Sequence, residues 1–435
     1  MTTPNTKEWR EKSKHFQKIE REAKMVLEAK VMRIQKDIES IAQFTSTPGE
    51  GVTRLSYTDE DRQARVYIKG RMVEAGLHVY EDAAGNIIGR RQGQIKNAPI
   101  VMLGSHFDSV NNAGSFDGVA GVVAALEMAR VFNEHGIVTK YPIEFVAFIE
   151  EEGTRFGPGL FGSRAMIGDV TKEELNTFSD DDGIPMACAM RDFGFDPDKI
   201  EDAVKKDLKA FIELHIEQGP ILENANLDVG IVEAIVGLRQ YYIEIEGRAD
   251  HAGTTPMNMR ADALVGAADI IMFINNSAKG EGEGTVATVG KMAISPGAAN
   301  IVPGKVTFTL DIRSIMEENI NRFMDKVNQH FVILQETYGV TCQIREEIKV
   351  RPVQLSKTII DALSEACTIK NIKSKRMVSG AGHDAMIMAR ITDTGMLFVP
   401  SKGGRSHCPE EWTDYIQLKT GVDILMDAVI KMDER

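Results

Sequence analysis

A histidine and two aspartates occur close together in the strings GSHFDSV at 104–110 and FDG at 116–118. Three glutamates, EEE at 150–152, follow an apolar run farther along the chain. Imidazole and carboxylate groups are the ligands with which proteins hold two divalent cations around a water molecule. These residue types therefore indicate metal-assisted hydrolysis as the first chemistry to consider.

The spacing of these residues allows specific roles, each with an ordinary alternative. His106 and Asp108 are two apart, so on an extended segment both side chains can face one side. His106 could bind a cation while Asp108 accepts its other ring N–H, although such a tripeptide also suits a surface loop. Asp117 precedes a predicted helix, where its carboxylate either caps that helix or bridges two cations, one with each oxygen.

The remaining candidates lie at the ends of apolar runs. Adjacent carboxylates such as Glu151 and Glu152 repel each other at the edge of a core unless cations compensate. One of the two can bind a metal ion and the other can act as general base, and a solvated acidic turn is the alternative. His215 and His407 occur in LHIEQG and SHCPEEW. A lone histidine beside an apolar run is usually a packing residue.

Strands that alternate with helices must position these side chains. The pattern predicts an α/β domain with a mixed, largely parallel sheet, in which sites lie at the carboxyl ends of strands. Apolar runs at 99–104 and 143–149 suit strands covered on both faces. The other expected elements are strands at 77–80, 86–90, 210–215 and 396–399, and helices at 59–75, 119–132 and 356–369.

The pattern changes near residue 237. Apolar and polar residues alternate at 240–246 and 305–312, and helical periodicity occupies 264–275 and 317–338. We therefore expect a small α+β lid domain inserted into the catalytic domain. The predicted division is 1–235 with 350–435 for the catalytic domain and 236–349 for the lid.

The N-terminal segment predicts a long amphipathic helix over 7–45. Its apolar positions recur at steps of three and four: Ile19, Ala23, Val26, Ala29 and Met32. Packing on the catalytic domain is the ordinary role of such a helix, and contact with a membrane or a partner is the alternative.

Composition narrows the classes of partner and location. The 435 residues are 43% hydrophobic and carry a formal net charge of −13, so no basic surplus exists to bind nucleic acid. We find neither a signal peptide nor an apolar run near the ~18 residues that span a bilayer. A cytoplasmic protein without membrane or nucleic-acid partners is expected.

The motifs resemble those of the M20 metallopeptidase-like amidohydrolases over about residues 60–425. The branch indicated is that of N-carbamoyl-L-amino acid hydrolases, allantoate amidohydrolases and β-ureidopropionases. The strings that carry the resemblance follow the family's order: GSHFDSV, FDGVAGV, EEEGTRFGPGLFGSRAM, ELHIEQGPILE, ADHAGTTPM, GAANIVPG, LDIRS, SGAGHDA and SHCPEEW.

The resemblance implies a dinuclear centre of zinc, manganese or cobalt, because its ligands supply only nitrogen and oxygen. Asp117 would bridge the two ions, Glu151 would be the general base, and Asp108 would support His106. The implied ligand sets are His106, Asp117 and His215 for one ion, and Asp117, Glu152 and His407 for the other.

The lid is implied to complete the site. His251 would stabilise the developing oxyanion, while Gln218, Asn300 and Arg313 would bind substrate, with Arg313 on its carboxylate. From the residues alone, Arg313 could merely pair with an acidic neighbour and Asn300 could merely turn a loop. In the family some lid residues serve the partner subunit of a homodimer, and His251 and Asn300 are the candidates here.

The activity implied is hydrolysis of the carbamoyl C–N bond of an N-carbamoyl-L-amino acid, giving amino acid, ammonia and carbon dioxide. Allantoate is the second candidate substrate and β-ureidopropionate the third. A metal-stabilised binding protein without turnover is the remote alternative.

Overall fold

The computed structural model describes residues 27–282 and 284–434. A nine-stranded mixed sheet forms the larger part of the molecule, in the order β1-β2-β4-β3-β5-β15-β6-β13 with β14 pairing to β6. Its strands are β1 (His78–Glu81), β2 (Ile87–Arg91), β3 (Ile100–His106), β4 (Ile143–Phe148), β5 (Leu208–Ile216), β6 (Val229–Ile235), β13 (Val353–Gln354), β14 (Ser374–Ser379) and β15 (Asp393–Val399).

The centre of this sheet is parallel and fully covered. β3 pairs in parallel with β4 and β5, and β15 pairs in parallel with β5. Every residue of β3 and β4 is buried, as the continuous apolar runs predicted. Because neighbouring parallel strands end at the same edge, the residues that follow β3 and β5 come together.

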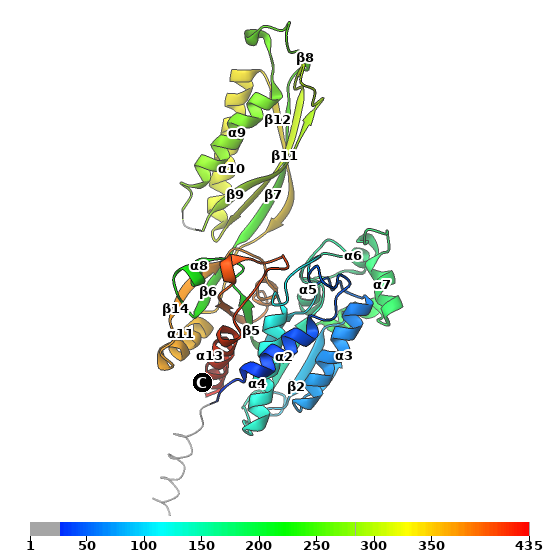
Figure 1. The fold of residues 1–435 in the computed structure, drawn as a ribbon, viewed down its shortest axis with the longest axis vertical. Helices are drawn as coiled ribbons and strands as arrows, with labels where there is room; N and C mark the ends of the chain where they lie inside the picture. The colour runs from blue at the N-terminus through cyan, green and yellow to red at the C-terminus, as the bar shows by residue number, and fades with distance from the viewer. Residues whose placement is uncertain (1–26, 283, 435) are drawn as a thin grey trace, which may run out of the picture.

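Helices pack on the large sheet and on one another (Figure 1). Those of this domain are α2 (Val31–Ile41), α3 (Asp59–Glu74), α4 (Val119–Glu134), α5 (Phe161–Ile167), α6 (Lys172–Thr177), α7 (Met186–Phe193), α8 (Ile221–Asn224), α11 (Lys357–Ile369), α12 (Asp384–Met388) and α13 (Tyr415–Glu434). Short 3-10 turns occupy Pro197–Ala203 and Lys402–Gly404. No helix of the described ranges is long and apolar enough to cross a bilayer.

A second, antiparallel sheet is inserted between β6 and β13 and projects from the large sheet (Figure 1). Its strand order is β12-β7-β11-β9, and α9 and α10 pack on it around a separate apolar core. Burial alternates residue by residue along β7 and β11, as the two-residue period predicted. The elements are β7 (Gly237–Glu246), β8 (Asp250–His251), α9 (Ala263–Ala278), β9 (Val286–Ser295), β10 (Ile301–Val302), β11 (Lys305–Ser314), α10 (Glu317–Tyr338) and β12 (Thr341–Val350), with a 3-10 turn at Met257–Met259.

This architecture confirms the predicted α/β class with a small α+β insertion. The extent of the N-terminal helix was wrong within the described residues. Helix α2 begins at Val31, because the N–H of Ala29 donates to Asp423 and that of Lys30 donates to Glu127. Met32 is 74% exposed, and the buried stripe is Ile34, Ile38 and Ile41. The predicted positions Ile19, Ala23 and Val26 lie outside the described residues.

Candidate metal centre and active site

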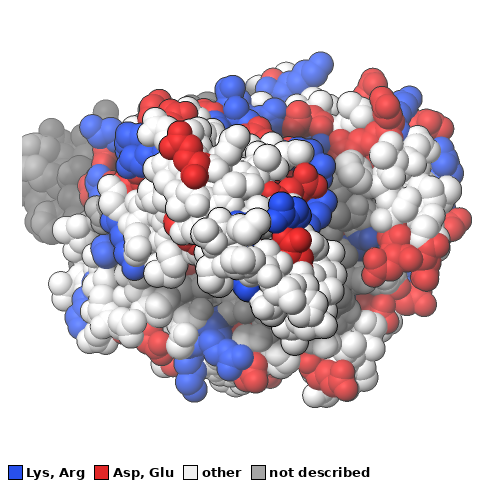
Figure 2. Space-filling view, turned by 90° about the horizontal axis from the view of Figure 1, so that it is seen from above, with Lys and Arg blue, Asp and Glu red and all other residues white. Residues whose placement is uncertain are grey.

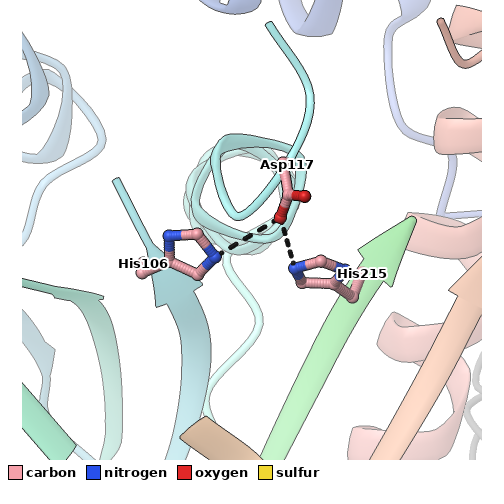
Figure 3. A group of neighbouring side chains, drawn as sticks. All are labelled: His106, Asp117 and His215. Atoms are coloured by element: carbon pink, nitrogen blue, oxygen red, sulfur yellow. Dashed lines mark ion pairs between the residues drawn. The ribbon is translucent and has the colours of Figure 1, made fainter. Parts of the chain in front are cut away.

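Three buried side chains from separate elements converge at the edge of the large sheet (Figure 3). His106 is the last residue of β3, His215 lies near the end of β5, and Asp117 precedes α4. Asp117 Oδ1 is 3.5 Å from His106 Nε2 and 3.1 Å from His215 Nε2. The three ligand atoms lie within 4.8 Å of one another, close enough to hold one cation.

The other oxygen of Asp117 faces a second set of ligands. Asp117 Oδ2 is 3.3 Å from His407 Nε2, which is 3.4 Å from Glu152 Oε1. These three residues form a second group with metal-binding spacing. A single carboxylate thus stands between two groups of nitrogen and oxygen ligands, the arrangement that a bridging ligand requires.

Two buried carboxylate oxygens fit the presence of cations. Asp117 Oδ1 and Glu152 Oε1 have no hydrogen-bond partner among the residues that the structure describes. A buried oxygen without a partner costs free energy, which a bound cation would offset. The donor set of imidazoles and carboxylates suits a borderline divalent ion such as zinc, manganese or cobalt.

Asp117 does not cap helix α4. The N-cap residue is Gly118, with φ 63° and no side-chain capping bond. A Cβ at Gly118 would lie 2.4 Å from ring atoms of His106, so only glycine leaves room for this imidazole. The carboxylate is therefore free of the helix end and points into the cluster.

The far side of each histidine ring is anchored by the backbone. His215 Nδ1 lies 2.9 Å from the carbonyl oxygen of Ile216, and His106 Nδ1 lies 3.2 Å from that of Asp108. A donated N–H at these positions leaves Nε2 of both rings as the metal-binding atom.

The Asp108 carboxylate has a different partner from the one expected. Its Oδ1 is 3.6 Å from His106 Nδ1, beyond hydrogen-bond distance. Its oxygens instead accept the backbone N–H groups of Glu151 and Glu152, at 3.0 and 3.1 Å. Asp108 thus supports His106 through its carbonyl and holds the segment that carries the two glutamates.

Burial and the neighbouring charges shift the pKa values of several side chains in the cluster. Burial and the nearby Glu152 raise the pKa of Glu151 well above its ordinary value, against the attraction of His106. Burial opposes ionisation of Asp117, but His215 and His106 hold its pKa well below the usual range. The carboxylates of Asp117 and Glu152 beside its ring raise the pKa of His407 to about 11. A cation that binds here must displace protons from the histidines.

A cavity of about 260 Å³ opens onto the cluster. Arg313, on β11 of the inserted sheet, lines it together with residues of the large domain. The lining residues are His106, Asp117, Glu151, Glu152, Leu160, His215, Gln218, Arg313, Ala381, Gly382, His383 and His407.

Two predicted substrate residues lie in this cavity. Arg313 pairs with Asp311 at 3.0 Å and donates to the carbonyl oxygen of Gly380 at 2.9 Å. The sheet neighbour that was the alternative for Arg313 is therefore present, yet the guanidinium also reaches the site. Gln218 donates to Asp117 Oδ2 at 2.7 Å.

The structure does not bring His251 and Asn300 to this cavity. Both are exposed: His251 is the last residue of β8 and Asn300 directly precedes β10, at the end of the insertion remote from the large sheet (Figure 1). Their segments meet each other, since the N–H of Ala252 donates to the carbonyl oxygen of Asn300 at 2.9 Å. Neither residue lines the cavity of its own chain.

Sequence reasoning assigned no role to several neighbours of the site, among them Leu160, His383, Ser406 and Glu411. Leu160 lines the cavity with φ 60°, an uncommon backbone conformation for leucine, and its only sequence signal is its place in EEEGTRFGPGLFGSRAM. Ser406 and Glu411 contact Asp117 from the far C-terminal segment. Their only signal is the company of His407 in SHCPEEW.

Known proteins match this chain over most of its length. Residues 102–431 match the model of "Peptidase family M20/M25/M40". An N-carbamoyl-L-amino-acid amidohydrolase of Paenarthrobacter aurescens is 46% identical, across 93% of this chain and 98% of that protein. An allantoate amidohydrolase of Bacillus subtilis is 36% identical, across 91% of this chain and 96% of its own.

Solved structures agree with the sequence comparison. An amidase of the hydantoinase/carbamoylase family from Burkholderia multivorans superposes with a TM-score of 0.88 at 33% identity, covering 93% of this chain and 98% of that one. The chain therefore belongs to the peptidase family M20/M25/M40, in its branch of hydantoinase/carbamoylase amidohydrolases.

Proposed function

We propose that this chain is a dinuclear metal-dependent amidohydrolase that cleaves the carbamoyl C–N bond of an N-carbamoyl-L-amino acid. The proposal rests on the position of Asp117. Its two carboxylate oxygens face separate ligand groups, and they lie 3.1 to 3.5 Å from the Nε2 atoms of the histidines in those groups. One cation would be held by His106, Asp117 and His215, and the other by Asp117, Glu152 and His407. Family membership and 46% identity to an N-carbamoyl-L-amino-acid amidohydrolase support the reaction class.

The chemistry follows from the side chains around the cavity. The cations, when bound, supply Lewis acidity that acidifies a water molecule and polarises the carbamoyl carbonyl. Glu151 belongs to neither ligand set and lines the cavity, so it accepts the proton of the attacking water. It then returns that proton to the leaving nitrogen as the C–N bond breaks. One water molecule is consumed, and the carbamic acid that this cleavage leaves breaks its remaining C–N bond by loss of carbon dioxide, so that amino acid, ammonia and carbon dioxide are the products.

Arg313 and Gln218 orient the substrate in this proposal. Arg313 is the guanidinium that lines the cavity, and its planar fork suits the carboxylate that every candidate substrate carries. Gln218 has a buried Oε1 without a hydrogen-bond partner within the described ranges, which leaves an acceptor for a substrate N–H.

We assign the missing oxyanion donor to a second copy of the chain. His251 and Asn300 lie far from their own cavity, so a homodimer joined through the insertion would bring them to the partner's site. Edge strand β9 supports this assembly, because no strand of the described residues pairs with its outer side and it exposes Val286, Met292 and Ile294. Seen from the end of the insertion, the centre of the surface carries few charged groups (Figure 2). An interface there would bury few charged groups.

The substrate is tested with purified protein, reconstituted with Mn²⁺ or Zn²⁺, and a panel of ureido acids. The panel contains N-carbamoyl-L-amino acids, their D-enantiomers, allantoate and β-ureidopropionate, and ammonia release is the readout. Fastest turnover of an N-carbamoyl-L-amino acid is expected. Preference for allantoate, whose hydrolase from Bacillus subtilis is 36% identical, would assign the second candidate instead.

Glu151→Gln separates catalysis from metal binding. The amide cannot accept the proton, so turnover falls by about 100-fold or more while two metal ions stay bound. Near-normal turnover would contradict the assignment of Glu151. Two bound metal ions without ammonia release from any ureido acid by the unmodified protein would favour the binding-protein alternative.

A further inference from the structure

A buried glutamate joins the C-terminal segment to the bridging aspartate. Glu411 is 3% exposed, and its Oε1 accepts the backbone N–H groups of Phe116 and Asp117 at 2.9 and 3.0 Å. Its Oε2 lies 2.7 Å from the hydroxyl oxygen of Ser406. That hydroxyl oxygen is in turn 2.6 Å from Oδ2 of Asp117. The contacts close a ring that holds Asp117 at both its backbone and its carboxylate.

The surrounding packing is built around this glutamate. A Cβ on Gly114 would lie 2.3 Å from the Cβ of Glu411, so glycine leaves the space that the side chain fills. The rings of Phe116 and Trp412 pack edge to face with their centroids 5.2 Å apart, next to the hydrogen-bonded residues on both segments. The two segments are thus joined by apolar as well as polar contacts.

Asp117 needs such a restraint because its own helix supplies none. It precedes the N-cap of α4, and its Oδ1 accepts no hydrogen bond within the described part of the chain. A bridging carboxylate must keep each oxygen aimed at a different cation, and an aspartate in a loop can turn about two side-chain bonds. Glu411 restrains the peptide, and Ser406 restrains Oδ2 together with the amide of Gln218, which donates to the same oxygen.

We propose that Glu411 is a positioning residue that, with Ser406, orients Asp117 for both cations. The inference rests on the proposed dinuclear centre and adds two residues that touch neither cation. Loss of the ring weakens binding of the ion that shares Oδ2 of Asp117, because that oxygen is the one the hydroxyl contacts. Partners of metal ligands typically account for ~10–100-fold in metal affinity.

Three variants test the ring, with Ser406→Ala as the main one because it removes a single oxygen from a half-buried position. Glu411→Ala opens the ring at its other member. Glu411→Gln is the rescue variant, since its carbonyl oxygen still accepts both peptide N–H groups and its amide can donate to Ser406. Thr413→Val is the matched control: it deletes a nearby buried hydroxyl, which donates to the carbonyl oxygen of Pro400 at 3.1 Å.

The measurements are Mn²⁺ titration of metal-free protein by calorimetry, bound metal per chain, and thermal unfolding without metal. We expect Ser406→Ala and Glu411→Ala to bind one of two ions about 10-fold or more weakly, and Glu411→Gln to remain within about 3-fold of the unmodified protein. The control should lose thermal stability without losing metal affinity.

The outcomes separate the inference from the function on which it rests. If the unmodified protein binds two ions and Ser406→Ala binds both equally well, the positioning role is overturned and the dinuclear centre stands. If the unmodified protein binds fewer than two ions, the dinuclear centre and the positioning role both fail. Should Glu411→Ala not fold, Ser406→Ala decides alone.

Discussion

The remote position of His251 leads to a prediction about mixed dimers. Arg313 lines the cavity and pairs with Leu238 on β7, whereas His251 lies beyond the other end of that strand at Glu246. Eight residues of strand span roughly 26 Å, more than any side chain covers. His251 therefore acts in the partner's cavity or in neither.

The perturbation combines two inactive chains. One carries Glu151→Gln and keeps His251, and the other carries His251→Ala and keeps Glu151. Differently tagged chains are expressed together, and the mixed dimer is purified through both tags. If His251 acts across the dimer, one of the two sites has every group it needs, so the mixed dimer shows about half of the unmodified activity per dimer.

A second mixed dimer reverses the expectation. A doubly substituted chain, Glu151→Gln with His251→Ala, is paired with an unmodified chain. Across-dimer action leaves neither site complete, whereas action within one chain leaves one complete site and about half of the activity. Ammonia release with an N-carbamoyl-L-amino acid is the assay. Activity in the second dimer and not in the first would refute the reasoning.

Three further predictions concern single positions. Gly118→Ala should lower the free energy of unfolding by more than Gly136→Ala, because only the alanine at 118 displaces His106. Gly136 is the control, since it has a similar φ of 61° and a Cβ there would have no atom within 4 Å. Denaturant unfolding of both variants measures the difference. Arg313→Lys should raise KM for a ureido acid about 10-fold or more, with bound metal unchanged, since the forked contact is lost. Mn²⁺ affinity should rise between pH 6 and pH 8. The pKa of His407 is raised to about 11, so the imidazole holds a proton that the cation must displace, and this proton becomes easier to remove as pH rises. Equal affinities at the two pH values, measured by calorimetry, would contradict this prediction. In the metal-free protein the same raised pKa makes the free energy of unfolding fall with pH. The contribution of His407 to stability is complete below the ordinary pKa of histidine and declines as pH rises toward about 11.

The local pattern of the sequence determined the architecture. The apolar runs that became β3 and β4 are buried at every residue, and the two-residue alternation of β7 and β11 follows the exposed and covered sides of the inserted sheet. Periodicity reports how many faces of an element are covered, and it needs no knowledge of the partner. The strings around His106 and His215 could be placed at strand ends for the same reason.

Contacts between distant parts of the chain decided what the pattern could not. Helix α2 begins at Val31 because Asp423 and Glu127 take the preceding N–H groups, and both acceptors lie far away in sequence. The local sequence allows Asp117 to cap a helix, but in the structure its two oxygens lie between His215 and His407. A capping aspartate and a bridging one have the same local sequence, so only packing distinguishes them.

The restraint on Asp117 and the location of His251 depend on tertiary structure alone. Glu411 lies 294 residues from Asp117, and nothing in the spacing of SHCPEEW shows which peptide its carboxylate will hold. His251 lies in ADHAGTTPM, one of the strings that carry the family resemblance. It is nevertheless remote from the cavity of its own chain, because the whole length of β7 separates them. The sequence determined which chemical groups were available, and the tertiary structure decided which of them meet, because side-chain chemistry is local whereas proximity in space is set by the whole fold.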